Sequence, residues 1–146
     1  MTEPFFPNID KITYAGPDSD DLLSFRWYDA DRRVGDKTMA EHLRFGVCYW
    51  HSFAWDGSDI FGQGTFDRPW NPLSRTGDAS MDPLDAAKTK MAAAFEFIEK
   101  LGAPFFSFHD IDIAPAGATF AESARYLDEM VDEAAAHMER TGIKLL

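Results

Sequence analysis

One histidine and two carboxylates follow a run of apolar residues in the last third of the sequence. In the segment FSFHDIDIAPAG, residues 106–117, His109 and Asp110 come directly after the apolar residues, and Asp112 lies three positions beyond His109. A carboxylate at this spacing can accept the proton on Nδ1 of the imidazole and turn the other ring nitrogen toward a substrate. The pair therefore fits acid–base chemistry. A structural role also fits, with the histidine bonded to backbone groups and both aspartates capping the loop.

An earlier apolar run ends in further ring-bearing residues. Residues 43–55, LRFGVCYWHSFAW, are continuously apolar and rich in aromatic side chains, which predicts a strand buried on both faces. Trp50, His51 and Trp55 lie toward its end. Because reactive side chains cluster where parallel strands end, we expect these rings near His109. His51 by itself is more typical of a packed histidine than of a catalyst.

Two amphipathic helices must position these segments. Asp82 before Pro83 predicts an N-cap with proline at the first helical position, and Gly102 predicts the end of that helix. TFAE at 119–122 has the spacing of a capping box, and Gly142 predicts the second end. The apolar stripe of the first helix comprises Leu84, Ala87, Met91, Ala94, Phe95, Ile98 and Leu101, and that of the second Phe120, Ala124, Leu127, Val131, Ala134 and Met138.

The apolar runs at 103–114 and 143–146 complete a β-α-β-α-β order, which is typical of a parallel sheet with crossover helices. We therefore predict an α/β fold that forms the N-terminal portion of a (β/α)8 TIM barrel, since a complete barrel takes about 250 residues. A three-stranded sheet that is stable alone is the alternative. Residues 1–42 are expected to form an N-terminal arm, and 43–146 the first strands and helices of the incomplete barrel.

Charge and composition narrow the class of protein. Fourteen basic against 25 acidic residues give a net charge of -11, which disfavours nucleic acid and anionic membranes as partners. No apolar segment is long enough for a membrane span, and the first residues do not resemble a signal peptide, so we expect a cytoplasmic protein. The single cysteine, Cys48, excludes an internal disulfide. The polar loop at 56–81 carries Phe61, Phe66 and Trp70, and its length indicates a functional or assembly loop.

The sequence resembles the xylose isomerase family, specifically its longer-chain class, over nearly its whole length. Three stretches carry the resemblance in the right order. They are MAEHLRFGVCYWHSFAWDGSDIFGQGTFDRPW, FEFIEKLGAPFFSFHDIDIAPAGATFAE and GIKLL.

The resemblance implies a homotetrameric enzyme that interconverts D-xylose with D-xylulose, and D-glucose with D-fructose, with the aid of two divalent cations, Mg, Mn or Co. It implies that His109 bonds the sugar ring oxygen during ring opening and that Asp112 orients His109. Trp50 would line the sugar pocket, and Phe61 would reach into a neighbouring subunit's site. In the family the metal ligands come from later strands that this chain lacks, so we expect no metal ligands here and no activity from this chain alone. A non-catalytic α/β module that assembles with other chains is the alternative.

Overall fold

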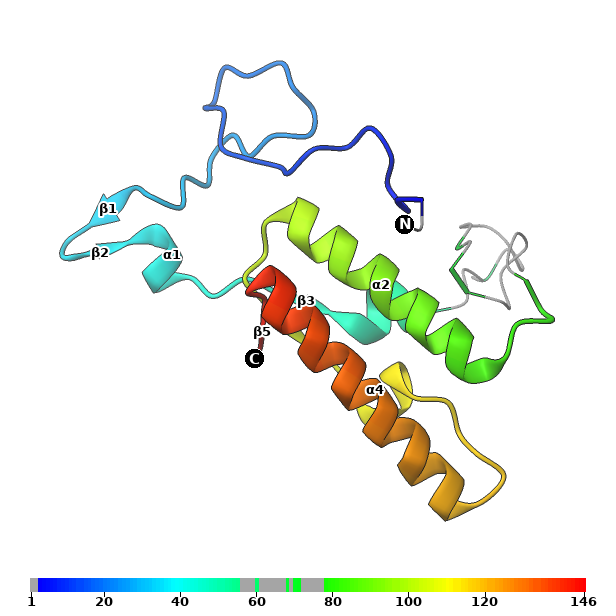
Figure 1. The fold of residues 1–146 in the computed structure, drawn as a ribbon. Helices are drawn as coiled ribbons and strands as arrows, with labels where there is room; N and C mark the ends of the chain where they lie inside the picture. Colours follow the sequence, from blue (N-terminus) through cyan, green and yellow to red (C-terminus); the bar gives the residue numbers. More distant parts are fainter. Residues whose placement is uncertain (1–2, 56–59, 61–67, 69, 72–77) are drawn as a thin grey trace.

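The computed structural model describes residues 3–55, 60, 68, 70–71 and 78–146, with the side chain of His51 left out. Two helices of about twenty residues dominate it (Figure 1). The elements are β1 (Arg33–Val34), β2 (Lys37–Thr38), α1 (Met39–His42), β3 (Gly46–Cys48), the π-helix η1 (Trp50–Ala54), α2 (Pro83–Leu101), β4 (Phe105–Ser107), α3 (Asp110–Ile113), α4 (Phe120–Thr141) and β5 (Lys144–Leu145).

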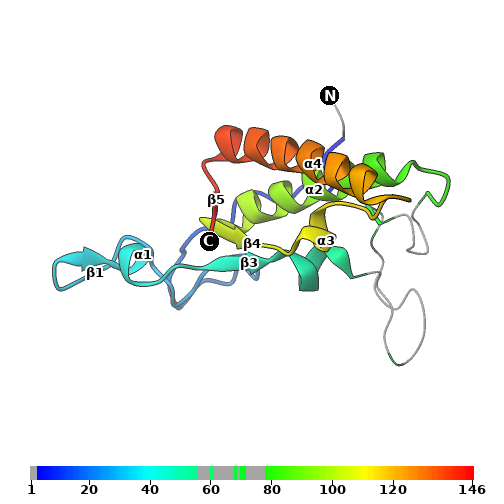
Figure 2. The same cartoon turned by 90° about the horizontal axis from the view of Figure 1, so that it is seen from below.

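Strands β3, β4 and β5 form a parallel sheet in that order, with Val47 opposite Phe106 and Phe106 opposite Leu145. Helix α2 connects β3 to β4, and α4 connects β4 to β5, and both helices lie on the same side of the sheet (Figure 2). The predicted α/β class and parallel sheet are therefore confirmed. The carboxyl ends of β3 and β4 lead directly into η1 and α3, which carry the residues of interest.

The two long helices begin and end where their capping residues predict. Asp82 Oδ1 accepts the backbone N–H groups of Leu84 and Asp85, and Gly102 closes α2 in the left-handed conformation at φ 76°. Thr119 caps α4 through the N–H of Glu122, and Gly142 closes that helix at φ 74°. Glycine suits both closing positions because it has no Cβ to clash at positive φ.

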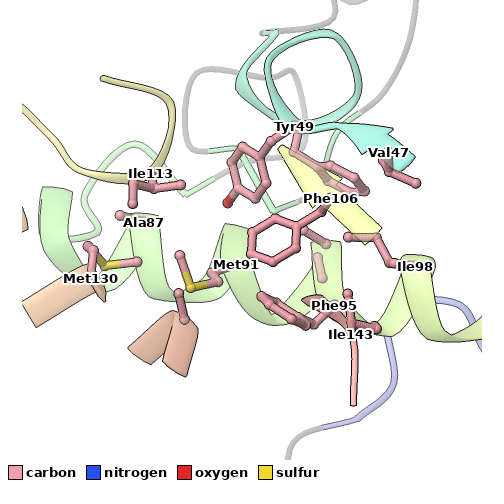
Figure 3. Close-up of a cluster of buried hydrophobic side chains, with 14 of the residues drawn as sticks. Val47, Tyr49, Ala87, Met91, Phe95, Ile98, Phe106, Ile113, Met130 and Ile143 are labelled. Carbon is pink, nitrogen blue, oxygen red and sulfur yellow. The ribbon is translucent and has the colours of Figure 1, made fainter. Parts of the chain in front are cut away.

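The core lies between the sheet and α2, as Figure 3 shows. The rings of Phe95 on α2 and Phe106 on β4 lie 5.1 Å apart at 65°, an edge-to-face arrangement. Met91 and Ile98 are also fully buried on this face of α2. The apolar stripe expected for the first helix is therefore confirmed by its central members.

The strands are shorter than the apolar runs indicate, and this part of the prediction is wrong. After Cys48 the chain turns into η1, in which the buried rings of Tyr49 and Phe53 pack at 5.6 Å. Likewise β4 ends at Ser107, and α3 follows. An apolar run specifies burial, and a short helical turn can bury it as well as a strand can.

The stripe on α4 also differs from the prediction. Phe120 is 90% exposed and Val131 is 47% exposed, whereas Met130 is fully buried and Ala134 nearly so. Helix α4 packs along α2, and the contact follows Met130 and Ala134. The predicted stripe is therefore confirmed at Leu127, Ala134 and Met138, which pack in the core, and wrong at Phe120 and Val131.

The N-terminal arm runs past α2, and the β1–β2 hairpin and α1 extend away from the main body (Figures 1 and 2). Glu96 of α2 accepts the backbone N–H groups of Phe5 and Phe6 at 2.8 and 3.0 Å, which fastens the arm to the helix. The expected division at residues 42 and 43 stays a prediction. In the 56–81 loop, Trp70 is buried against Phe6 and Phe53.

None of the helices in the described part of the chain is both long and apolar enough to cross a membrane.

Candidate active site

His109 and Asp112 are joined by two contacts to a single oxygen. Asp112 Oδ2 accepts the backbone N–H of His109 at 2.8 Å and lies 3.0 Å from its ring Nδ1. The backbone N–H of Asp112 in turn donates to the carbonyl of His109 at 2.9 Å. These bonds form because His109 is the N-cap of the one-turn helix α3 and Asp112 stands three residues later, where the side chain folds back on the cap. A carboxylate here favours the tautomer with the proton on Nδ1.

The two members of the pair differ in exposure. The side chain of Asp112 is 8% exposed, whereas that of His109 is 63% exposed. The buried carboxylate therefore holds the ring from within, and the ring edge that carries Nε2 lies away from it. A neutral imidazole held in this way can accept a proton at Nε2 and donate it again.

Trp50 supplies an aromatic wall beside the pair. Its ring centroid lies 4.6 Å from that of His109, with the planes inclined by 42°. Trp50 begins η1 directly after β3, and His109 follows β4, so the neighbouring parallel strands bring the two rings together. This is the juxtaposition that the sequence predicts for the strand ends.

The other predicted residues are placed less fully. Phe61 lies outside the described residues, as does the side chain of His51. The ring of Trp55 lies 5.4 Å from the guanidinium of Arg68, a cation–π contact. Asp110 is exposed, and its carboxylate accepts the backbone N–H of Ile111 at 2.8 Å within the first turn of α3.

Two groups behind the pair were missed by sequence reasoning. Tyr49 is fully buried, and its hydroxyl has no hydrogen-bond partner among the described residues. Burial, and secondarily the charge of Asp112, raises the pKa of Tyr49 far above its usual value, so the phenol stays neutral. Burial lowers the pKa of Lys90 on α2, and the Asp112 carboxylate opposes that shift. The available signal was that Lys90 interrupts the apolar stripe between Ala87 and Met91.

The described side chains do not fit a divalent cation. No group of three or more His, Cys, Asp or Glu side chains in the described ranges is arranged to hold a metal ion. His109 and Asp112 contact each other, whereas hard cations such as Mg²⁺ need several converging oxygen ligands. The described part of the site thus consists of the hydrogen-bonded pair His109 and Asp112 with the ring of Trp50 beside it.

Comparison with known proteins places this site in context. The chain is 50% identical over 143 residues to a protein named xylose isomerase from Pseudomonas savastanoi pv. phaseolicola, covering 98% of the chain and 31% of that relative. It is 51% identical over all 146 residues to a xylose isomerase from Brucella suis and 50% identical to one from Mesorhizobium japonicum, covering 32% of each. The chain thus spans about a third of the length of these curated relatives. No family model matches it.

Proposed function

Starting from this homology, which is consistent with an N-terminal portion of a xylose isomerase, we propose that the chain supplies the sugar ring-opening part of an aldose–ketose isomerase. The substrate pair is D-xylose and D-xylulose, with D-glucose and D-fructose as a second pair. One observation carries the proposal: the buried Asp112 fixes the exposed His109 beside the Trp50 ring. The three residues come from the ends of two neighbouring parallel strands.

Ring opening needs a group that both takes and gives a proton. The cyclic sugar loses the proton of its anomeric hydroxyl, the bond between C1 and the ring oxygen breaks, and the ring oxygen gains a proton. His109 Nε2 can accept the first proton and donate the second, while Asp112 Oδ2 holds Nδ1–H and stabilises the imidazolium between the two transfers. Trp50 orients the apolar face of the sugar against His109.

We propose that the subsequent shift of hydrogen between C1 and C2 requires two divalent cations, Mg, Mn or Co. Such cations polarise carbonyl and hydroxyl oxygens when bound. Because the described residues do not fit a cation, we propose that the ligands lie in the remaining two thirds of the full-length protein. Under this proposal the 146-residue chain alone forms no xylulose.

The proposal that the metal ligands lie outside this chain is tested with two samples, the purified 146-residue chain and the full-length protein. Each is incubated with D-xylose and Mg²⁺. The expected result is xylulose from the full-length protein and none from the short chain. Mg²⁺-dependent xylulose formation by the short chain alone would overturn the proposal that the metal ligands lie outside it.

We further propose that the sheet is part of a (β/α)8 barrel and that the full-length protein is a homotetramer. The sequential strand order, with α2 and α4 on one face, supports the barrel. In this account Phe61 reaches into a neighbouring subunit's site. Replacing Phe61 with Ala should therefore raise KM for the sugar in the assembled enzyme, and an unchanged KM would contradict that role.

A non-catalytic assembly module is the second candidate. The N-terminal arm exposes large apolar side chains, with Leu22 89% and Trp27 83% exposed, and such residues are common at protein contacts. The His109→Asn variant of the full-length protein distinguishes the two candidate functions. Loss of turnover with unchanged mass supports the isomerase, whereas turnover equal to that of the unaltered protein supports the module.

A further inference from the structure

His137 lies in the contact between the two long helices, α2 and α4, which run side by side (Figure 1). Its ring stacks on that of Phe95 of α2, with the centroids 4.7 Å apart and the planes inclined by 14°. Phe95 is fully buried, and the side chain of His137 is only 15% exposed. A titratable ring thus forms part of the packing that joins α4 to α2.

Both ring nitrogens of His137 face charged groups of α4. Nδ1 lies 3.3 Å from Nη2 of Arg140, and Nε2 lies 3.4 Å from Oε1 of Glu133. A guanidinium group can only donate hydrogen bonds, so Nδ1 must accept from Arg140. The single ring proton then sits on Nε2 and faces the Glu133 carboxylate. The arrangement therefore requires a neutral ring in one tautomer.

Arg140 carries the contact across to α2. Its Nη1 donates to Oε2 of Glu99 at 3.1 Å, while its Nη2 donates to His137. The other charged groups near this end of α2, Glu96 and Lys100, pair with each other and bond to the N-terminal arm. Glu99 is thus the carboxylate of α2 that the His137 cluster engages.

The end of α4 leads directly into β5. Thr141 Oγ1 donates to the carbonyl of His137 at 2.8 Å and accepts the backbone N–H of Ile143 at 3.3 Å. Ile143 is buried in the core, and Lys144, the first residue of β5, is exposed. The position of His137 is therefore coupled, through two hydrogen bonds, to the point where the chain enters the sheet.

We propose that His137 is a pH-sensitive switch in the contact between α4 and α2. The neutral ring holds Arg140 toward Glu99, and protonation of the ring releases Arg140 and loosens the end of α4. A protonated ring carries hydrogen on both nitrogens, so Nδ1 can no longer accept a hydrogen bond. Two positive charges then face each other across the 3.3 Å contact, and they repel.

The direction of the switch follows from burial. Burial lowers the pKa of His137, the Glu133 carboxylate raises it and Arg140 lowers it again, so that the pKa lies below the ordinary value of 6.5. When the helix end opens into water, the ring regains a pKa of about 6.5. Between these two values the open form binds a proton that the packed form does not, so the packing weakens as the pH falls.

Amide hydrogen exchange in the full-length protein tests the switch between about pH 7.5 and about pH 5.5, a range above the ordinary carboxyl pKa values. The decisive variant is His137→Gln, whose planar side chain has an oxygen that can accept from Arg140 but does not titrate. His42→Gln is the matched control, because His42 is an exposed histidine that contacts the carbonyl of Val34.

The readout is the exchange of residues 137–146 after correction for the intrinsic pH dependence of amide exchange. In the unaltered protein and in His42→Gln, this exchange should accelerate below pH 6.5 by up to about tenfold per pH unit, the effect of one proton. In His137→Gln it should stay constant. The same acceleration in all three proteins overturns the proposal, and so does constant exchange in the unaltered protein.

A second measurement covers the case in which His137→Gln does not fold. The exchange rate of the ring C2 hydrogen against pH, followed by mass spectrometry, gives the pKa of His137 in the full-length protein. Arg140→Gln should raise this pKa and Glu133→Gln should lower it. Arg125→Gln is the control, because it removes an arginine of α4 that pairs with Glu129 at 2.9 Å. A shift in Arg140→Gln no larger than that in Arg125→Gln overturns the proposal.

This inference does not depend on the proposed function. Neither measurement involves a sugar, so both decide the role of His137 even if the full-length protein has no isomerase activity. Conversely, an active isomerase in which His137→Gln and His42→Gln exchange alike would contradict the switch and leave the proposed function standing.

Discussion

Asp112 Oδ2 accepts the backbone N–H of His109 at 2.8 Å and lies 3.0 Å from Nδ1 of the same residue. One buried oxygen thus fixes both the main chain and the ring of its partner. The backbone bond sets where α3 begins, and the ring contact sets which nitrogen of His109 carries a proton. The Asp112 carboxylate therefore determines both the backbone conformation of this turn and the orientation of the His109 ring.

Replacing Asp112 with Asn should reduce turnover of D-xylose in the full-length protein by about 100-fold or more, the scale of a lost acid–base contribution. An amide can donate a hydrogen bond to Nδ1 and so favour the wrong tautomer. Steady-state kinetics would measure the loss. Asp110→Asn is the control, because Asp110 is exposed and its carboxylate accepts the backbone N–H of Ile111 instead of contacting His109. Equal losses in both variants would contradict a specific role for Asp112.

Replacing Trp50 with Ala should raise KM for D-xylose more than it lowers kcat, because in this account the indole lies beside His109 as a binding surface and transfers no proton. Trp50→Phe keeps an aromatic face and should retain most of the affinity. The kinetic constants of the two variants check this expectation. Trp27→Phe, at a position 83% exposed on the arm, is the control. A loss confined to kcat in Trp50→Ala would argue against a substrate wall.

Replacing Glu96 with Ala should release the N-terminal arm from α2. The carboxylate accepts the N–H groups of Phe5 and Phe6, and such bonds to a charged group contribute about 1.5 to 3 kcal/mol each. Limited proteolysis should then cut the arm faster. Glu99→Ala, which removes only a surface pair with Arg140, should leave cleavage unchanged. Equal cleavage in both variants would show that Glu96 does not hold the arm.

The same contact should depend on pH. Burial raises the pKa of Glu96, but hydrogen bonds from Lys100, Phe5 and Phe6 outweigh it and hold the pKa below 4.5. A carboxyl group whose pKa is lower in the folded state stabilises that state fully at pH values above its unfolded-state pKa. This contribution is lost as the pH falls through the folded-state pKa. The amide NMR signals of Phe5 and Phe6 should therefore move toward the chemical shifts of a disordered chain below pH 4.5. Shifts that begin near neutral pH would contradict this assignment.

The helices could be predicted almost to the residue because each end depends on one local group. The side-chain oxygens of Asp82 and Thr119 accept hydrogen bonds from free backbone N–H groups at the start of each helix, and Gly102 and Gly142 adopt positive φ at the end. These are contacts within a few residues along the chain, so the sequence alone carries them.

The strand ends could not be predicted in the same way. The apolar runs continue past Cys48 and Ser107, but the backbone leaves the sheet there and turns into η1 and α3. Where a strand ends depends on its partner across the sheet and on what packs over it, and these are distant in sequence. The burial of Met130 and the exposure of Val131 on α4 have the same origin, since the packing of α4 against α2 determines them.

Sequence analysis predicted the contacts of the candidate site that join residues close in sequence or at neighbouring strand ends and missed those that depend on helix packing. His109 and Asp112 are three residues apart, so one helical turn is enough to join them. Trp50 could be placed beside His109 because parallel strands end at the same edge of a sheet. Lys90 lies 22 positions before Asp112, and a lysine on a helix ordinarily faces water, so its inward position appears only once α2 is packed.

The central claim is that His109 opens the sugar ring, and the most direct test compares a substrate that cyclises with one that cannot. In the full-length protein, His109→Asn should lower turnover of D-xylose by about 100-fold or more but leave turnover of the acyclic triose D-glyceraldehyde nearly unchanged. The mass of the assembly should be the same in both proteins. Equal losses on the two sugars would contradict a ring-opening role, and equal turnover of D-xylose by both proteins would contradict any catalytic role for His109.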